Sequence, residues 1–250
     1  ATSVYGYPGP VASAAARRDP AFLKRLGAEM KQMAQDLGLV SIFSRLNPVL
    51  GNRDLIPDIG TVEALGETVS IDLSLSKSSQ WSQYRANHRR NIRSARRKGM
   101  HAYRDVSWRH FERFVDLYQS TMQRLDADGY YHFDKAYLAQ LCEALGERAH
   151  LFVAEQEGVV CFAALMVQTG HVIQYHLSGT DPVYQALAPL KLVLDRARLW
   201  GNTTGAHFLH LGGGVGSQED SLFHFKAGFS SVRHRFHIWK WAVQGAVYDD

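Results

Sequence analysis

Three consecutive glycines and a downstream lysine are the residues of this sequence best suited to chemistry. Gly212, Gly213 and Gly214 directly follow a predicted buried strand at residues 206–211. Backbone of this kind lets a ligand approach closely, and its N–H groups can bind anionic oxygens. Lys226 lies between aromatic residues a few positions later, where a lysine can hold a phosphate or stabilise an oxyanion at a carbonyl. An ordinary glycine turn and a solvated surface lysine are the alternative interpretations.

A second candidate is the basic segment from Arg85 to Lys98, which holds seven Lys or Arg residues and no acidic one. Without these seven, the 28 basic residues of the chain fall to 21 against 24 acidic ones, so the remainder carries −3 while the whole carries +4. The basic character therefore belongs to one segment, which favours an anionic partner.

Helical spacing in this segment predicts a basic connecting helix that docks by one side. Its apolar stripe comprises Trp81, Tyr84, His88, Ile92 and Ala95, and the remaining positions carry arginines that face outward. Arginine binds phosphate oxygens bidentately, so RNA or a polyphosphate is the predicted ligand. A solvated helix face is the alternative. The residues assigned to RNA or phosphate binding are Arg89, Arg93, Arg96 and Arg97.

The elements that must position these residues follow an informative order. Asp19 and Pro20 predict the start of a first helix that Gly38 ends. Strands are expected at 39–43 and 68–73, and the basic helix follows them. Two helices then begin near Ser107 and Asp134 and precede three strands at 150–155, 159–168 and 171–178, with connections short enough for hairpins.

The rest of the chain completes one recognisable pattern. A helix at 186–200, a strand at 206–211, a short helix at 220–225 and a last strand at 233–243 are predicted. If residues 103–106 supply a first strand, the order is that of an acetyltransferase lobe. We therefore predict an α/β fold with a mixed (α+β) sheet, similar to the GNAT acetyltransferases.

Composition excludes several classes of protein. No run of eighteen apolar residues exists, so no membrane-spanning helix is expected. The two cysteines, Cys142 and Cys161, are far apart, and the twelve histidines lack metal-ligand spacing. We expect a cytoplasmic protein without a metal site or a cofactor.

Three strings of residues resemble the Fem-type (FemABX-like) aminoacyl-tRNA-dependent transferases, which have the GNAT fold. The first is Leu209–Gly214 followed by Asp220-Ser221-Leu222-Phe223 and Phe225-Lys226-Ala227-Gly228-Phe229. The second is the opening Tyr5-Gly6-Tyr7-Pro8-Gly9-Pro10, and the third is Asn91-Ile92-Arg93-Ser94-Ala95-Arg96-Arg97-Lys98-Gly99. They occur in the family's order and span nearly the whole chain.

The resemblance implies tandem GNAT-like lobes and an enzyme that forms an amide bond. We expect a partial, short first lobe at residues 1–78, the basic helix at 79–99 and a second lobe at 100–250. Such enzymes move an amino acid from aminoacyl-tRNA to an amine of a small peptide or nucleotide-linked peptide acceptor. Phe225 and Lys226 would lie by the aminoacyl end of the tRNA, as the catalytic pair.

The residues expected to bind the substrates come from the same comparison and from the fold. Arg124 and Tyr130 or Tyr131 are the nearest matches to an arginine and a tyrosine that contact the acceptor's diphosphate. Tyr175 lies on the third strand of the meander, which lines the acyl cleft of this fold. The expected substrate-binding residues are Tyr5, Tyr7, Asn47, Arg124, Tyr131, Tyr175, Gly212 and Gly213.

Departures from the family pattern leave alternatives open. Asn47 replaces the aspartate proposed to receive the amine's proton, and an amide cannot act as a base near pH 7. Residues 179–190 lack the closely spaced glycines that bind the pyrophosphate of coenzyme A, and Asp181 would repel a phosphate. An acyl-coenzyme A N-acyltransferase and a non-catalytic RNA-binding relative are the rival interpretations. A peptide natural product could replace a peptidoglycan precursor as the acceptor.

Overall fold

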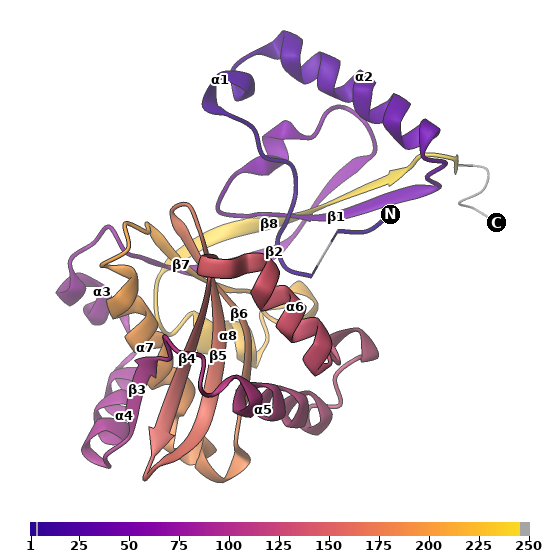
Figure 1. Ribbon diagram of the computed structural model, residues 1–250. Coiled ribbons are helices and arrows are strands. Elements are labelled where there is room, and N and C mark those ends of the chain that lie inside the picture. Colours follow the sequence, from indigo (N-terminus) through magenta and orange to yellow (C-terminus); the bar gives the residue numbers. More distant parts are fainter. Residues whose placement is uncertain (4, 246–250) are drawn as a thin grey trace. The chain divides into compact units, whose positions relative to one another are not determined.

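The computed structural model describes residues 1–3 and 5–245, which form two compact units (Figure 1). Of the described residues, unit 1 comprises 1–3, 5–68, 213–220 and 233–245, and unit 2 comprises 69–212 and 221–232. The lobes predicted from sequence order stay a prediction, because the two units are defined by spatial proximity and each is discontinuous in the chain.

Unit 1 holds one part of the eight-stranded mixed sheet and two helices that follow each other in the chain. In this part the strand order is β1-β8-β2, and β1 pairs with β8 in antiparallel fashion. Trp239 packs with Leu46 and Ile59 in its core and donates from Nε1 to the Ile59 carbonyl over 2.8 Å. Its elements are α1 (Ala14–Arg17), α2 (Pro20–Asp36), β1 (Ser41–Leu46), the 3₁₀ turn η1 (Asn52–Leu55), β2 (Thr61–Asp72), η5 (Val215–Ser217) and β8 (Val232–Ala242).

Sequence signals placed the long helix of unit 1 well. The Asp19 side chain accepts from the Ala21 N–H at the start of α2, where Pro20 occupies the first turn. This carboxylate satisfies a backbone donor that has no partner within the helix. The predicted cap is therefore confirmed.

Unit 2 holds the larger part of the mixed sheet. In order, the strands are β2-β7-β6-β5-β4-β3. Neighbours are antiparallel except β6 and β7, which are parallel and are connected through helix α7. The predicted three-strand meander is confirmed. The strands are β3 (His101–Arg104), β4 (Ala149–Gln156), β5 (Val159–Thr169), β6 (Val172–Thr180) and β7 (Phe208–Gly212).

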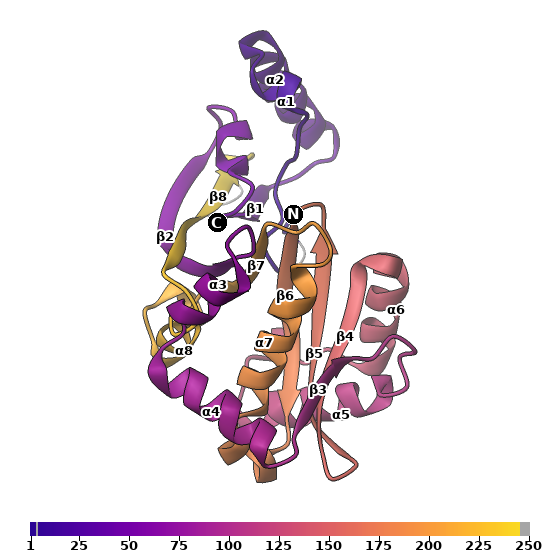
Figure 2. The same ribbon diagram turned by 90° about the vertical axis from the view of Figure 1, so that its left-hand side faces the viewer.

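Helices cover both faces of this sheet (Figure 2). On one face, α5 packs so closely that the Gly179 Cα lies against the backbone of Leu117, leaving no room for a Cβ atom. On the other face, α7 and the basic helix α4 enclose the main hydrophobic core, which includes Phe152, Phe162 and Phe229. The helices are α3 (Lys77–Gln83), α4 (Ala86–Arg97), α5 (Phe111–Arg124), α6 (Lys135–Leu145), α7 (Pro189–Gly201) and α8 (Ser221–Lys226).

Two predicted helices begin or continue differently from the expectation. The single basic helix is divided into α3 and α4, because Tyr84 takes an extended conformation with ψ 135°. The helix predicted from residue 186 begins at Pro189, and the 3₁₀ turn η4 (Pro182–Leu187) precedes it. Ala188 joins the two with φ 57°, a left-handed conformation that no α-helix continues through.

A buried carboxylate fixes α4 and α7 to each other. Asp195 on α7 is 1% exposed and contacts Arg198 Nη2 at 2.8 Å and Arg96 Nη2 at 2.6 Å. The Tyr84 hydroxyl donates to the same carboxylate over 3.4 Å. Burial, and then the negative charge of Asp195, raise the pKa of Tyr84 well above its usual value, so the phenol remains a donor. Tyr84, the residue at which α3 and α4 are divided, therefore contacts this carboxylate.

We expect Asp195→Asn to destabilise the protein by about 3 to 5 kcal/mol, because Arg198 would keep its charge in a buried place with no counter-ion. Denaturant unfolding followed by circular dichroism measures this change. Asp58→Asn, at an exposed position of unit 1, is the control and should change stability by less than about 0.5 kcal/mol. An equally small effect of Asp195→Asn would show that the carboxylate does not hold the two helices.

Candidate active site

Helix α8 and the turn after it carry the predicted catalytic pair. Phe223 and Phe229 are buried in the main core of unit 2, with Phe225 packed against it. His88 of α4 holds this turn: its Nε2 lies 3.0 Å from the Phe225 carbonyl oxygen and its ring lies 4.5 Å from that of Phe229. A Cβ atom on Gly228 would come within 2.5 Å of His88. The glycine is therefore required by the close approach of the imidazole.

The His88 imidazole is neutral over the physiological pH range. Its side chain is 3% exposed, and this burial lowers the pKa to about 4, with a further contribution from the nearby Lys191 and Arg85 charges. A carbonyl oxygen only accepts hydrogen bonds, so Nε2 carries the proton and donates to Phe225. The basic helix is thus bound by a neutral donor to the turn that carries the predicted catalytic pair.

Lys226 and Tyr175, which were both predicted at the site, are buried in unit 2. Lys226 is only 8% exposed, which removes the interpretation as a solvated surface lysine. Tyr175 packs on the same core cluster as Phe225, and its hydroxyl hydrogen-bonds the Ser178 hydroxyl. Burial raises the pKa of Tyr175 to about 12, so the phenol stays protonated. Tyr175 lies on the sheet face that α7 covers.

The fold itself requires glycine at two positions of the run from Gly212 to Gly214. Gly212 has φ 79°, a conformation that favours glycine. A Cβ atom on Gly214 would lie 2.0 Å from the Gln218 carbonyl oxygen and 2.3 Å from Asp220 Oδ1. The Asp220 carboxylate accepts from the Val215 N–H over 3.1 Å. This loop therefore uses backbone donors within the protein, and its binding of anionic oxygens stays a prediction.

Three residues predicted to bind substrate meet in unit 1. The Gly213 N–H donates to the Tyr7 hydroxyl over 3.3 Å, and the Tyr7 ring packs edge-on against Phe236. Asn47 Nδ2 donates to the Tyr7 carbonyl over 3.0 Å, while its Oδ1 accepts from the N–H groups of Val49 and Leu50.

These hydrogen bonds give the side-chain amide of Asn47 a structural role. Both ends of the Asn47 side chain bond to the backbone. Nδ2 bonds to the opening segment of the chain, and Oδ1 bonds to the turn that follows position 47. A carboxylate could accept from the turn but could not donate to the Tyr7 carbonyl. The Tyr5 side chain is half-buried in the same segment, and the substrate-binding roles of Tyr5, Tyr7, Asn47 and Gly213 stay predictions.

Arg124 and Tyr131 lie elsewhere in unit 2. Arg124 ends α5 and donates to the Thr180 carbonyl over 3.3 Å. The Tyr131 carbonyl accepts from the Tyr118 hydroxyl over 2.6 Å. Both belong to the sheet face that α5 covers, opposite to Phe225, so within unit 2 the structure does not bring these two groups of predicted site residues together.

The four predicted RNA-binding arginines of α4 differ in how far the fold engages them. Arg89 donates to the Ser82 and Tyr84 carbonyls, at the end of α3. Arg96 contacts Asp195, and the Arg93 guanidinium lies 5.7 Å from the Trp81 ring centre. Arg97 is exposed. Since Arg89 and Arg96 also hold the helix in place, their binding of RNA stays a prediction.

Sequence reasoning missed two polar residues beside the predicted catalytic pair. With its amide oriented for hydrogen bonding, Asn91 of α4 accepts from Lys191 Nζ over 2.9 Å and donates to the Asn87 carbonyl over 3.0 Å. The same Lys191 ammonium lies 5.8 Å from the Phe225 ring centre. Lys191 lies in the first turn of α7, where the sequence analysis looked for glycines and not for a cation.

Other chemistry finds little support in the described ranges. No group of three potential metal ligands occurs in residues 1–3 and 5–245, and no helix there has the length and apolarity needed to cross a bilayer. Cys142 and Cys161 are unbridged thiols, and burial raises the pKa of each to about 11. Neither is therefore a ready nucleophile.

Comparison with known proteins agrees with this architecture. The family model described as acetyltransferase (GNAT) domain matches residues 82–226, which is more than half of the chain. None of the curated proteins compared with the chain matches it.

Solved structures show the same fold over most of the chain. FemX superimposes with a TM-score of 0.74 at 12% identity, over 93% of this chain and 79% of FemX. L-PGS from Bacillus licheniformis gives 0.58 at 16% identity, over 90% and 74%. The C-terminal domain of an Agrobacterium fabrum protein, provisionally a lysylphosphatidylglycerol synthetase, gives 0.63 at 14%, over 92% and 78%. The predicted likeness to the Fem-type and GNAT fold is confirmed.

The low pKa of His88 makes a prediction about acid stability. Below pH 6.5 the unfolded chain binds a proton at this imidazole, whereas the folded protein does not until about pH 4. Stability is therefore complete above pH 6.5 and falls as the pH drops from there to about 4. His150 and His176, with pKa values lowered to about 4 by burial, act in the same direction.

His88→Gln keeps an N–H donor and removes the titration, so it should reduce the slope of unfolding free energy against pH by up to about 1.4 kcal/mol per pH unit. Denaturant titrations from pH 7.5 to 4.5 measure the slope. His101→Gln, at an exposed position of β3, controls for the loss of an imidazole. An unchanged slope in His88→Gln would mean that folding does not shift the pKa of His88.

Proposed function

Because the chain belongs to the family defined by the acetyltransferase (GNAT) domain, we propose that it moves an aminoacyl group from tRNA to the amine of a peptide-like acceptor. The coarser statement, that it is a GNAT-like acyltransferase, follows from the family and the fold. The donor and the acceptor belong to the proposal. Charged tRNA is found in the cytoplasm, so the proposal places the reaction there.

The observation that carries the proposal is the attachment of a basic helix to the catalytic turn. His88 and Arg85 both bond carbonyls of α8, at Phe225 and His224. The outer face of α4 carries the exposed residues Arg90, Arg93 and Arg97, with no acid anywhere between Arg85 and Lys98. An RNA held on this face by its phosphates would have its position fixed relative to Phe225 and Lys226.

The proposed reaction needs no covalent enzyme intermediate, because the ester of aminoacyl-tRNA is already activated. The acceptor's amine nitrogen bonds to the ester carbonyl carbon, and the bond from this carbon to the ribose oxygen breaks. One proton passes from the amine to the departing ribose hydroxyl. Lys226 would stabilise the negative charge that develops on the carbonyl oxygen, and binding would bring the two reactants together.

The acceptor is proposed as a peptide that carries a free amine, either in a nucleotide-linked peptidoglycan precursor or in a peptide natural product. The resemblance of Tyr5–Pro10 and of Arg124 and Tyr131 to family residues supports this class. The amide at position 47 excludes one mechanism within it: Asn47 does not accept the amine's proton, since it is neutral and bound to Tyr7. An amine that arrives deprotonated meets this requirement.

One observation favours acyl-coenzyme A as a second candidate donor. Asp181 would repel a phosphate near the start of α7, but its negative charge is compensated by an arginine. Its Oδ2 contacts Arg113 Nη2 at 2.8 Å, and its Oδ1 accepts from the Val183 N–H. One of the two arguments against coenzyme A is thereby weakened. The other, the lack of closely spaced glycines at 179–190, remains.

We expect Lys226→Met to lower aminoacyl transfer on the order of 100-fold, since the loss of one group that stabilises an oxyanion has effects of this size. Methionine keeps an apolar stem of similar length in this buried position. The assay uses tRNA charged with radiolabelled amino acids, with and without ribonuclease, and acceptors that include a nucleotide-linked pentapeptide and short peptides.

The matched control is Lys31→Met on the exposed side of α2, which should leave transfer unchanged. Transfer of label from acetyl-coenzyme A, with none from charged tRNA, would contradict the proposal and favour the second donor. Binding of tRNA without any transfer in the native protein would instead indicate a non-catalytic RNA-binding relative.

Arg97→Ala should weaken tRNA binding and reduce the salt dependence of the binding constant by about one phosphate contact. Arg97 is suited to this test because it is exposed, so its loss leaves the Asp195 contacts intact. Filter binding at several salt concentrations gives the slope of log K against log salt. Arg18→Ala, an exposed arginine of unit 1, serves as the comparison, and equal slopes for the two variants would argue against RNA on this face.

A further inference from the structure

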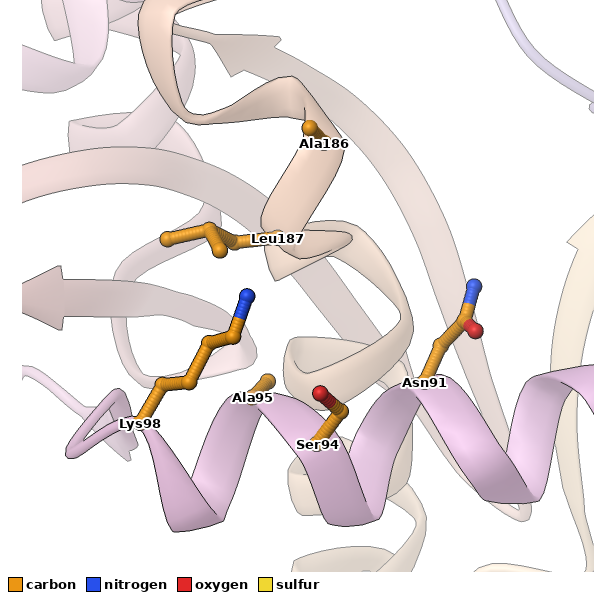
Figure 3. Close-up of a pocket in the computed structure, with 6 residues that line it drawn as sticks. All are labelled: Asn91, Ser94, Ala95, Lys98, Ala186 and Leu187. Atoms are coloured by element: carbon orange, nitrogen blue, oxygen red, sulfur yellow. The ribbon is translucent and has the colours of Figure 1, made fainter.

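A small polar cavity lies between the basic helix and the segment that precedes α7 (Figure 3). It has a volume of about 50 Å³. Asn91 and Ser94 of α4 and Lys98, the residue directly after it, line one side, and Ala186 and Leu187 line the opposite side. Ala95, at the base, is the remaining lining residue. All of these residues belong to unit 2.

The residues that line the cavity include one cation and no acid. The cation is the ammonium group of Lys98. Behind Asn91, the Lys191 ammonium donates to the amide oxygen. Burial lowers the pKa of Lys191, and the nearby charge of Arg90 lowers it further. Lys98 at the cavity and Lys191 behind Asn91 therefore place positive charge on this side of α4, which an anion would stabilise.

Size and donors agree on the kind of anion. A water molecule needs about 10–15 Å³ of such volume, so this cavity holds a group of a few oxygen atoms. The Ser94 hydroxyl makes no hydrogen bond to the described parts of the chain and can donate. The amide nitrogen of Asn91 has two N–H groups, of which one bonds the Asn87 carbonyl. Together with Lys98, these donors match the oxygens of one phosphate group.

We propose that the cavity formed by Asn91, Ser94 and Lys98 with residues 186–187 is a binding site for a single phosphate group of a substrate. Asn91 and Lys191 connect this site to the ring of Phe225. A phosphate here is therefore separated from the catalytic turn by two side chains. Such a phosphate would position the ester or thioester of the donor beside Lys226 for attack by the acceptor's amine.

The phosphate has three possible sources. The identity of the source rests on the proposed function, whereas the site itself does not. A phosphodiester near the 3′ end of tRNA fits the proposed donor. The diphosphate of coenzyme A fits the second candidate. The diphosphate of a nucleotide-linked acceptor fits neither donor and would make the cavity part of the acceptor's site.

The experiment measures binding by isothermal titration calorimetry with the full chain. The probes are inorganic pyrophosphate, a short single-stranded RNA ending in CCA, coenzyme A and uridine diphosphate. Lys98→Gln removes the charge of the cavity, and Ser94→Leu fills its volume without a change in charge. Ser94→Ala keeps the volume open, and Lys77→Gln removes a charge from an exposed position on α3. Circular dichroism checks that each variant is folded.

The proposal predicts that Lys98→Gln and Ser94→Leu weaken binding of the preferred probe about tenfold or more, that Ser94→Ala, which removes one donor and leaves the volume open, weakens it less than Ser94→Leu does, and that Lys77→Gln changes it less than threefold. Tight binding of the RNA probe supports both the site and the proposed donor. Preference for coenzyme A or uridine diphosphate, with the same response to the variants, supports the site and contradicts the tRNA donor as its source. Binding that is indifferent to Ser94→Leu, or no binding of any probe, overturns the proposal.

Discussion

The buried carboxylate of Asp195 is the constraint on which the arrangement of unit 2 depends. It is almost inaccessible to water and is compensated from two directions, by Arg198 of its own helix and by Arg96 of α4. A buried charge is tolerated only while its partners stay in place. The position of α4 on α7 is therefore not adjustable at small cost. His88, the cavity and the contact to Phe225 all derive their geometry from this helix pair.

The sequence predicted the repeating elements well, because their signals are local. Asp19 before Pro20 and Asp134 before Lys135 are caps that act within one helical turn, and alternating apolar residues mark the strands of the meander. The break at Tyr84 was missed for a physical reason. Tyr84 continues the apolar stripe of the predicted helix, and its departure from helical geometry serves a carboxylate 111 positions away. No local pattern contains that information.

The same limit applies to the candidate site. Lys226 and Phe225 were found through a resemblance, and burial of the lysine agrees with a role at the site. Gly214 and Asn47 show where residue type alone misleads. A glycine after a strand suggests space for a ligand, yet the space beside Gly214 is filled by Gln218 and Asp220. Asn47 suggests a lost catalytic base, yet its two ends hold two backbone segments. Only the distribution of neighbouring atoms distinguishes these interpretations.

The basic helix resolves a conflict between stability and binding. Like charges on one helix repel each other, and a helix devoted wholly to RNA would be costly in the unbound protein. Here the arginines are divided around the helix axis: Arg89 and Arg96, seven positions apart and so on one side, donate to backbone carbonyls and to Asp195. Arg90 and Arg97, one position further along, are exposed on the neighbouring side of the helix. Because a shift of one residue turns a side chain by about 100°, the same short sequence both anchors the helix and presents a cationic face.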